Sequence, residues 1–430
     1  MTDTVSLDQS DLPLRVRDFY LGRQPVLDRN QALYGYELLF RSAGQDEGAS
    51  AQGAQTGLPA TATVIAHVAQ LGLARAIGDA ACFLNVDRDV LFSDIFAFLP
   101  RERTVLEIVA TMDPDDAVLA RMQELARHGF RFALDGVGGD SARLQRLLPL
   151  AAFVKLDLRS THRDTLRGLV SRLQGLGKTV IAEKVETRDE YHVCLDAGFD
   201  YFQGFYFARP AVLGGRKLSP SQATVLALMN QVMSDVDNAD IERAVKKDVT
   251  LALNLLRLVN TPAVGAGRRI ESISQALTLL GRRQLQRWLQ ILLFAEPDVR
   301  GHSQSPLLML ATTRARLMEL LAQRMRPGQR NVADIAFTVG MMSLMDTLFC
   351  IPMRDIVEQI PVIDEVRAAL LNRTGFFGEL LKLAESIERM DDEQDDMLAG
   401  LKSLAFDGDD LAELEVAAFE WSDKVVRYAI

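Results

Sequence analysis

The sequence predicts an α/β barrel followed by an all-helical region, and three observations support this. The first half of the chain alternates short β-type runs with amphipathic helical stretches, which is typical of a parallel sheet. About seven or eight such runs within roughly 200 residues favour a closed, TIM-like (β/α)8 barrel. After Pro210 the β-type runs almost disappear and helical patterns follow one another to the end. The length of 430 residues suits two or three domains.

The first two β-type runs are expected to form a hairpin, because they meet at the turn-like sequence Asp28-Arg29-Asn30. Later runs are separated by helical stretches, for which 61–77, 113–128 and 165–176 are examples. Asp113 followed by Pro114 is expected to begin one of these helices as its N-cap and first turn. In order, the runs are FYLGRQPVL, ALYGYELLF, ACFLNVD, TVLEIVA, RFALDGV, AFVKLDL, TVIAEKV and YFQGFYF.

A Gly-rich stretch at 213–216 is expected to be the hinge between the barrel and the helical half. An acidic cluster at 391–396 is expected to be a solvated turn before a last helix. The predicted division is an N-terminal tail over 1–17, a barrel over 18–211, a linker over 212–218, a helical domain over 219–390, and the acidic turn with the C-terminal helix over 391–430.

Composition excludes several classes of protein. Hydrophobic residues make up 48% and charged residues 25%, so each domain can form a core. The net charge of −10 argues against a broad electrostatic surface for nucleic acid or for an anionic membrane. Three widely spaced cysteines match no zinc or redox motif and indicate a reducing compartment. With a polar N-terminus and no apolar run of membrane length, we expect a soluble cytoplasmic protein.

Polar side chains recur at or just past the ends of the predicted barrel strands. They are Glu37, Asn85, Glu107, Asp135, Lys155, Asp157, Glu183 and Gln203. The C-terminal strand ends of a barrel converge on one rim, so these side chains are expected to meet there. Carboxylates with an amide offer hard oxygen ligands for Mg²⁺, Mn²⁺ or Ca²⁺, which would polarise a phosphate. Each residue taken alone fits an ordinary loop cap or ion pair, but the series does not.

Residues 18–210 resemble the EAL domain, a bacterial barrel that binds and hydrolyses cyclic di-GMP. The run YELLFR at 36–41 stands where that family has its Glu-Ala-Leu signature and a following Arg. The motifs FLNVD, LEIV, VKLD, AEKVET and YFQGFYFARP follow in the family's order. The resemblance implies Mg²⁺ or Mn²⁺ held by Glu37, Asn85, Glu107 and Asp135, catalysis through Glu183 and Lys155, and nucleotide contacts from Arg41, Leu39, Asp157, Gln203 and Glu186.

Two departures from the family pattern bear on catalysis. The family has two adjacent aspartates in its catalytic segment, but here Asp135 is followed by Gly136, which has no ligand atom. The resemblance implies a two-metal mechanism in which the missing carboxylate helps to hold the second ion. Ala110 also stands where a second Glu is usual. We therefore expect one metal site rather than two, and slow or absent hydrolysis.

The helical half resembles the HDOD domain, an all-α relative of the HD phosphohydrolases. The matching runs are LLRLVN at 255–260 and ISQAL at 273–277. Ser343 and Leu344 occupy the places of the His-Asp pair of HD enzymes, and neither is a good metal ligand. His302 has no partner at ligand spacing and is expected to be structural. This half is therefore predicted to be a non-catalytic module that binds a protein partner.

Two smaller features have an ordinary interpretation. Arg282, Arg283 and Arg287 beside Trp288 could stack on a phosphate ligand, but the solvated face of a helix is the preferred interpretation. The methionines at 341, 342 and 345 could form a docking surface, but core packing is preferred.

The resulting functional prediction is a cyclic di-GMP signalling protein. Its barrel is expected to be inactive or weakly active and to act as a nucleotide sensor or docking module. The alternative is an active metal-dependent phosphodiesterase that produces the linear dinucleotide pGpG, and a third is a scaffold that binds no nucleotide. No nucleic-acid or membrane partner is expected, and the family resemblance implies a homodimer.

Overall fold

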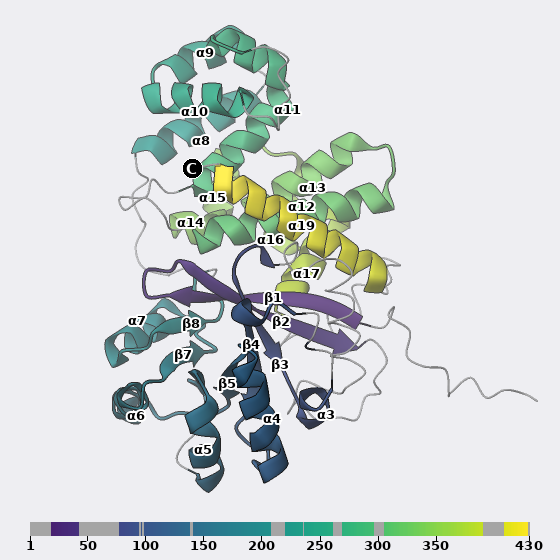
Figure 1. Cartoon of the computed structure of the whole chain (residues 1–430). Helices are drawn as coiled ribbons and strands as arrows, with labels where there is room; N and C mark the ends of the chain where they lie inside the picture. Colours follow the sequence, from purple (N-terminus) through teal and green to yellow (C-terminus); the bar gives the residue numbers. More distant parts are fainter. Residues whose placement is uncertain are drawn as a thin grey trace, which may run out of the picture.

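The N-terminal half forms a closed barrel and the C-terminal half is all-helical, which confirms the predicted fold class (Figure 1). This computed structural model describes residues 19–42, 77–93, 96, 99–137, 141–207, 220–234, 236–260, 269–295, 305–389 and 408–428. Several predictions fall outside them: the helix at 61–76, the glycine loop at 138–140, the linker at 212–218, His302 and the acidic cluster at 391–396. The side chain of Arg41 also lies outside the described set.

The eight strands are hydrogen-bonded in chain order around the barrel. They are β1 (Phe19–Asp28), β2 (Leu33–Ser42), β3 (Ala81–Asn85), β4 (Thr104–Val109), β5 (Arg131–Asp135), β6 (Phe153–Asp157), β7 (Thr179–Glu183) and β8 (Tyr201–Gln203). The strand β1 is antiparallel to both β2 and β8, and the other neighbours are parallel. The predicted hairpin causes this exception, because a turn of a few residues cannot make the crossover that a parallel pair needs.

Alternation along the strands places the polar residues above a packed apolar layer. Phe83, Val105, Ala133, Phe153 and Ile181 belong to one buried cluster inside the barrel. Each lies two residues before a polar residue of the predicted rim, so both point to the same face of the strand. The barrel is therefore filled at one end, and a ligand can approach the polar residues only from the other end.

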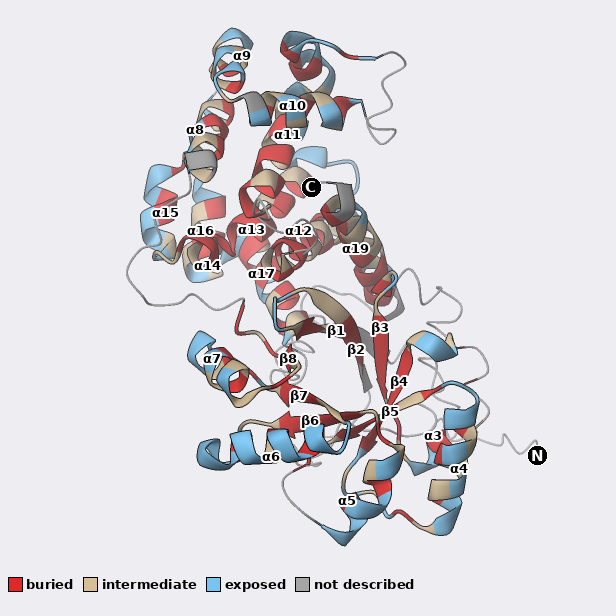
Figure 2. Ribbon diagram, turned by 60° about the vertical axis from the view of Figure 1, so that its left-hand side comes forward, coloured by how far each residue is buried: buried red, intermediate tan, exposed pale blue. Residues whose placement is uncertain are grey.

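Helices cover the outside of the barrel, where their buried faces contact the strands (Figure 2). They are α3 (Arg88–Leu91), α4 (Asp116–Arg127), α5 (Ala142–Leu147), α6 (Arg163–Gly175) and α7 (Arg188–Ala197), with short 3-10 turns η4 (Arg101–Arg103) and η5 (Leu148–Leu150). The predicted cap of α4 was wrong by two residues. Asp115, rather than Asp113, is the N-cap, and its Oδ1 accepts a hydrogen bond of 2.8 Å from the Val118 amide.

The C-terminal half packs as a layered set of helices beside the barrel, with α19 lying across β1 (Figure 1). They are α8 (Pro220–Met233), α9 (Asn238–Lys246), α10 (Val249–Val259), α11 (Ile273–Phe294), α12 (Pro306–Met325), α13 (Arg330–Met342), α14 (Met345–Phe349), α15 (Met353–Gln359), α16 (Asp364–Asn372), α17 (Gly375–Glu388) and α19 (Gly408–Tyr428).

One stretch corrects the expectation that no apolar run has membrane length. By length and composition alone, the helical stretch 330–349 is apolar enough to cross a membrane. However, 78% of its most apolar part is buried inside the protein. The three methionines at 341, 342 and 345 lie within it and are fully buried, as core packing requires. Burial of this kind is typical of a core segment.

The arginine cluster on α11 is only partly the solvated face that the sequence predicted. Trp288 is buried, as predicted. Arg283 is exposed and forms an ion pair of 3.1 Å with Asp334. Arg287, in contrast, packs over the Phe337 ring at 3.7 Å and pairs with Glu319. Its guanidinium is therefore part of the interior of the helical half.

Candidate functional site

Lys155 lies at the centre of the polar residues that the strand ends bring together. Its Nζ atom is 2.7 Å from Glu183 Oε1, 2.8 Å from Glu37 Oε2 and 2.9 Å from Glu107 Oε1. Lys155 and Glu107 are essentially inaccessible to solvent. Burial alone would lower the pKa of Lys155, but the surrounding carboxylates raise it well above its usual value. Lys155 is therefore held as an ammonium ion among carboxylates.

Amide side chains hold Glu37 on its remaining sides. Asn85 Nδ2 donates a 2.7 Å hydrogen bond to Glu37 Oε1, and Gln203 Nε2 donates one of 2.6 Å to Glu37 Oε2. Gln203 Nε2 also lies 2.6 Å from Gln24 Oε1, on β1. With every side of its carboxylate contacted, Glu37 is the most tightly positioned acid of the site.

The site has more acidic groups than basic ones. Glu37, Glu107, Asp135 and Glu183 interact electrostatically with the single ammonium of Lys155. Burial raises the pKa of Glu183 to about 8, and the Asp135 and Glu37 carboxylates add to this while Lys155 opposes it. Burial and the Glu37 carboxylate likewise raise the pKa of Glu107 well above its usual value. These shifts indicate a place where further positive charge is favoured.

The donor chemistry of these residues fits a hard divalent cation. Glu107 Oε2 and Gln203 Oε1 are buried acceptors without a hydrogen-bond partner among the described residues. Carboxylate and amide oxygens are the ligands that Mg²⁺ and Mn²⁺ prefer. Within the part of the chain that the structure describes, no three Asp, Glu, His or Cys side chains lie in positions that could together hold one metal ion. The reason is local: the Lys155 ammonium occupies the space between the three glutamates.

Gly136 leaves a gap beside Asp135 at the end of β5. Its φ angle is +69°, in the left-handed region that favours glycine. A Cβ atom built on Gly136 would meet no other atom within 4 Å. The position therefore has room for a side chain, and the missing carboxylate is a consequence of residue type rather than of crowding.

The residues that the resemblance assigned to the nucleotide form a second group, outside the lysine cluster. Asp157 pairs with Lys184 at 2.7 Å, and Glu186 pairs with Arg159. Leu39 is half-buried and lies two residues after Glu37 on β2, on the same face of the strand. Gln203 joins the lysine cluster instead. Asp157 and Glu186 are thus paired with partly exposed cations, and their assignment to the nucleotide stays a prediction.

Gln24 is a site residue that the sequence analysis missed. It lies opposite Glu37 in the β1–β2 register, and its Oε1 accepts from Gln203. The predicted rim comprises strand ends, whereas β1 is antiparallel to β2 and β8 and reaches the level of Glu37 near its middle. A polar residue between Arg23 and Pro25 on the inward face of a hairpin strand was the available signal.

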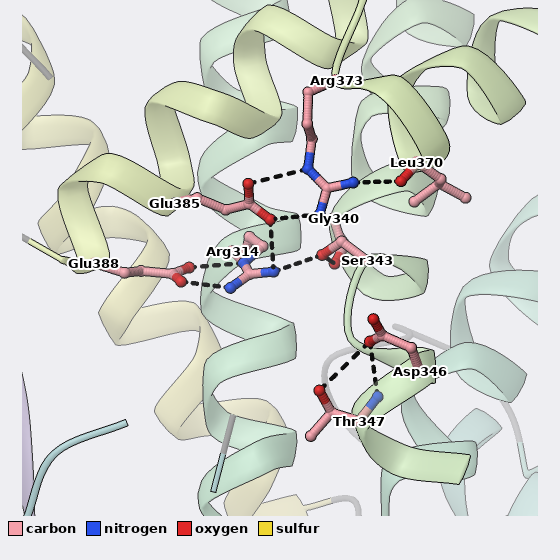
Figure 3. A network of polar contacts seen from close by, with 9 residues as sticks. All are labelled: Arg314, Gly340, Ser343, Asp346, Thr347, Leu370, Arg373, Glu385 and Glu388. Carbon is pink, nitrogen blue, oxygen red and sulfur yellow. Dashed lines mark hydrogen bonds and ion pairs between the residues drawn. The ribbon is translucent and has the colours of Figure 1, made fainter. Parts of the chain in front are cut away.

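The helical half contains a second buried polar network, which centres on Arg314 of α12 (Figure 3). Arg314 Nε lies 2.8 Å from Glu388 Oε1, and its second nitrogen also contacts that carboxylate. Arg314 Nη1 donates a 2.7 Å hydrogen bond to Ser343 Oγ and lies 3.6 Å from Glu385. Arg314 is 5% exposed, and all three nitrogens of its guanidinium have a hydrogen-bond partner.

Ser343, which stands in the place of the HD histidine, is thus part of an arginine–glutamate network. Its hydroxyl also donates to the Gly340 carbonyl at 2.7 Å. Leu344 is buried and has no ligand atom. Arg373 adds a second pair with Glu385, at 2.9 Å (Figure 3). A guanidinium therefore supplies the positive charge at this point of the helical half.

Arg314→Lys is expected to lower the free energy of unfolding by about 1.5–3 kcal/mol, because an ammonium cannot reproduce the paired contacts to Glu388 and the contact to Ser343. Urea denaturation of the full chain measures this. The matched control is Arg283→Lys, which alters an exposed pair and should leave the unfolding midpoint unchanged. Equal effects of both changes would show that the network contributes no more than a surface ion pair.

The comparisons with known proteins agree with the architecture of the chain. An EAL domain model matches residues 8–210, and an HDOD domain model matches residues 218–362. The chain is 31% identical over 413 residues to "Cyclic di-GMP phosphodiesterase CdgJ" of Vibrio cholerae, covering 95% of this chain and 93% of that protein. It is 30% identical over 375 residues to "Uncharacterized protein YuxH" of Bacillus subtilis, covering 86% and 90%.

Solved structures with similarity to the chain include two EAL proteins. The Bacillus subtilis YkuI protein, in complex with cyclic di-GMP and calcium, is 19% identical, with a TM-score of 0.39 over 64% of this chain and 74% of that one. Klebsiella pneumoniae BlrP1, in a complex with manganese and cyclic di-GMP, is 22% identical, with a TM-score of 0.37 over 46% and 58%. The two domain matches and the near full-length similarity to the Vibrio protein show that the chain belongs to the EAL-domain family, with an HDOD domain following its EAL barrel.

Proposed function

We propose that this protein acts in cyclic di-GMP signalling and that its barrel binds the nucleotide at the rim while hydrolysing it slowly or not at all. Membership of the EAL family and the phosphodiesterase name of the Vibrio relative support the nucleotide. The observation that carries the second part is Gly136, which provides no carboxylate at the position that follows Asp135 in the chain. A two-metal displacement would lack a ligand for its second ion.

The cation proposed for this rim is Mg²⁺ or Mn²⁺, at one site rather than two. Its ligands would be Glu37, Asn85, Glu107 and Asp135, and when bound it would polarise a phosphate and acidify a water molecule. Glu183 and Lys155 lie against the same carboxylates, at positions suited to holding and moving a proton. The buried acceptors Glu107 Oε2 and Gln203 Oε1 support a cation at this place.

The runner-up function is an active phosphodiesterase that produces pGpG. Its support is the intact cluster of Glu37, Glu107, Glu183 and Lys155, together with the similarity to a protein named as a phosphodiesterase over 95% of the chain. The two functions differ in turnover and not in binding. Calorimetric titration of the full chain with cyclic di-GMP, with and without Mg²⁺, followed by product analysis of the same sample, separates them. Binding without pGpG supports the first function, and rapid turnover supports the second.

Arg41→Ala is expected to weaken cyclic di-GMP binding about tenfold to hundredfold, with or without Mg²⁺, because a guanidinium can bind a phosphate through two charge-assisted hydrogen bonds. Calorimetry measures the change. The control is Lys178→Ala, because Lys178 precedes β7 and donates to the Ala151 carbonyl at 2.7 Å, at the opposite end of the strand from Glu183. An unaffected Arg41 variant beside a weakened Lys178 variant would contradict the proposed pocket.

The helical half is proposed to bind a protein partner, and the barrel to form a homodimer by analogy with the family. A cytoplasmic location is proposed from the reducing compartment that the cysteines indicate. Light scattering of the purified chain tests the dimer, which a monomer mass would exclude.

A further inference from the structure

A cavity of about 60 Å³ lies between the barrel and the helical half. One wall comes from β1 and β2, and the opposite wall comes from α12, α17 and α19, of which α19 lies across β1 (Figure 1). Most of its lining is apolar or aromatic, including Tyr36, Phe205, Phe207, Leu317 and Phe419. The cavity is separate from the lysine cluster, because Tyr36 and Glu37 are consecutive on β2 and point to opposite faces of the strand.

The charged groups around this cavity are matched with one exception. Arg314 is engaged by Glu388, Glu385 and Ser343. Arg23 lies between the Tyr36 ring at 4.2 Å and the Phe419 ring at 3.8 Å, and pairs with Asp423 at 3.6 Å. These cations are therefore already held in place by other groups.

The exception is Glu415 on α19. Its side chain is 0% exposed, lines the cavity, and has two carboxyl oxygens without a hydrogen-bond partner among the described residues. Burial raises the pKa of Glu415 well above its usual value. A buried carboxyl group with no partner is costly, and in native proteins such a group normally has a partner such as water, an ion or a ligand.

We propose that this interdomain cavity binds a small organic ammonium ion, with Glu415 as its counter-charge. An ammonium group offers several N–H donors for the two unpartnered oxygens, and its charge favours the ionised form of Glu415, which burial alone disfavours. Arg23 already lies over the Tyr36 and Phe419 rings, so the Phe205 and Phe207 rings are the ones that suit a cation and a short alkyl chain. An anion would repel ionised Glu415, and a neutral alcohol would supply no positive charge to favour that form.

The size of the cavity limits the ligand. It is smaller than the cavity of about 150 Å³ that accommodates benzene in an engineered core. A ligand with a few heavy atoms fits this space, so n-propylammonium is a suitable probe. 1-Propanol and propionate have the same chain length and differ in charge, which makes them matched comparisons. The inference does not depend on the proposed nucleotide activity.

The test uses the full chain and calorimetric titration with the three probes at constant ionic strength. We expect n-propylammonium to bind about tenfold or more tightly than 1-propanol, and propionate not to bind. Glu415→Gln keeps the shape of the side chain and should abolish the preference for the cation. Ala418→Leu fills the same cavity while retaining Glu415, and should abolish binding of both n-propylammonium and 1-propanol.

Circular dichroism of both variants confirms that each is folded before titration, and the two variants test the site independently. Equal affinity for the three probes, or a Glu415→Gln variant that still prefers n-propylammonium, would overturn the proposal. So would a crystal structure of the full chain grown with n-propylammonium in which only water contacts Glu415. A cation seated on Glu415 in that crystal, with the preference lost in the variant, would establish the site.

Discussion

Gly136→Asp is expected to raise the hydrolysis of cyclic di-GMP about 10²–10³-fold over the slow parent protein, since one transition-state contact is typically worth this much. The structure makes the change feasible. A Cβ atom at 136 meets nothing within 4 Å, and Asp is among the residues that tolerate a positive φ. The measurement is pGpG formed per unit time with Mg²⁺ or Mn²⁺ present.

Two matched variants separate the carboxylate from the backbone effect. Gly136→Ala imposes a side chain at the same φ of +69° without a ligand atom, and Gly136→Asn adds an amide without charge. Both should stay near the parent rate. A parent protein that already turns over rapidly would contradict the view that Gly136 limits catalysis. An Asp variant as slow as the parent would show that other differences from the EAL family pattern also limit hydrolysis. Ala110, which stands where a second Glu is usual, would be the next residue to change.

Lys155→Met is expected to lower the free energy of unfolding by about 3–5 kcal/mol, because it leaves buried carboxylates without their central ammonium ion. Glu37, Glu107 and Glu183 each lie within 3 Å of Lys155 Nζ, so they lose a common partner. Mn²⁺ should restore part of the stability, since a cation that binds only the folded chain stabilises it by about 2.7 kcal/mol at a hundredfold excess over its Kd.

Urea denaturation with and without Mn²⁺ measures both effects. Lys184→Met is the matched control, because Lys184 pairs with Asp157 on the same side of the barrel but its side chain is 51% exposed. Its loss should change stability by less than about 1 kcal/mol. If Lys155→Met were as stable as the parent, or if Mn²⁺ protected the parent and not the variant, the cluster would not be the cation site.

Much of the site could be predicted because strand alternation is a local property of the chain. Glu107, for instance, follows Val105 at a spacing of two, so both must point into the barrel once β4 forms. The convergence of β-strand ends on one rim then follows from the topology. The antiparallel start of the barrel was also predictable, since a short turn permits no other pairing.

The pairing of charges was not predictable in this way, because it depends on which side chains meet across distant segments. The sequence placed Lys155 on the rim without indicating its partners, and the structure shows it among three glutamates. Gln24 was not predicted because β1 is antiparallel to β2 and β8, so Gln24 reaches the site from the middle of its strand and not from its end. Arg314 lies on α12 among many apolar residues, and no local pattern identified its partner. Only the packing of α17 places Glu388 within hydrogen-bond distance of it.

The sequence by itself determined the two halves of this protein, the strand ends that carry its acids, and the absence of a carboxylate at Gly136. Those features depend on residue type and on periodicities of two or 3.6 residues, both of which can be read directly from one amino-acid sequence. The tertiary structure alone decided that Glu415 is buried without a partner between the barrel and α12. Burial and hydrogen bonding of one side chain depend on the whole surrounding fold, so no local pattern can report them.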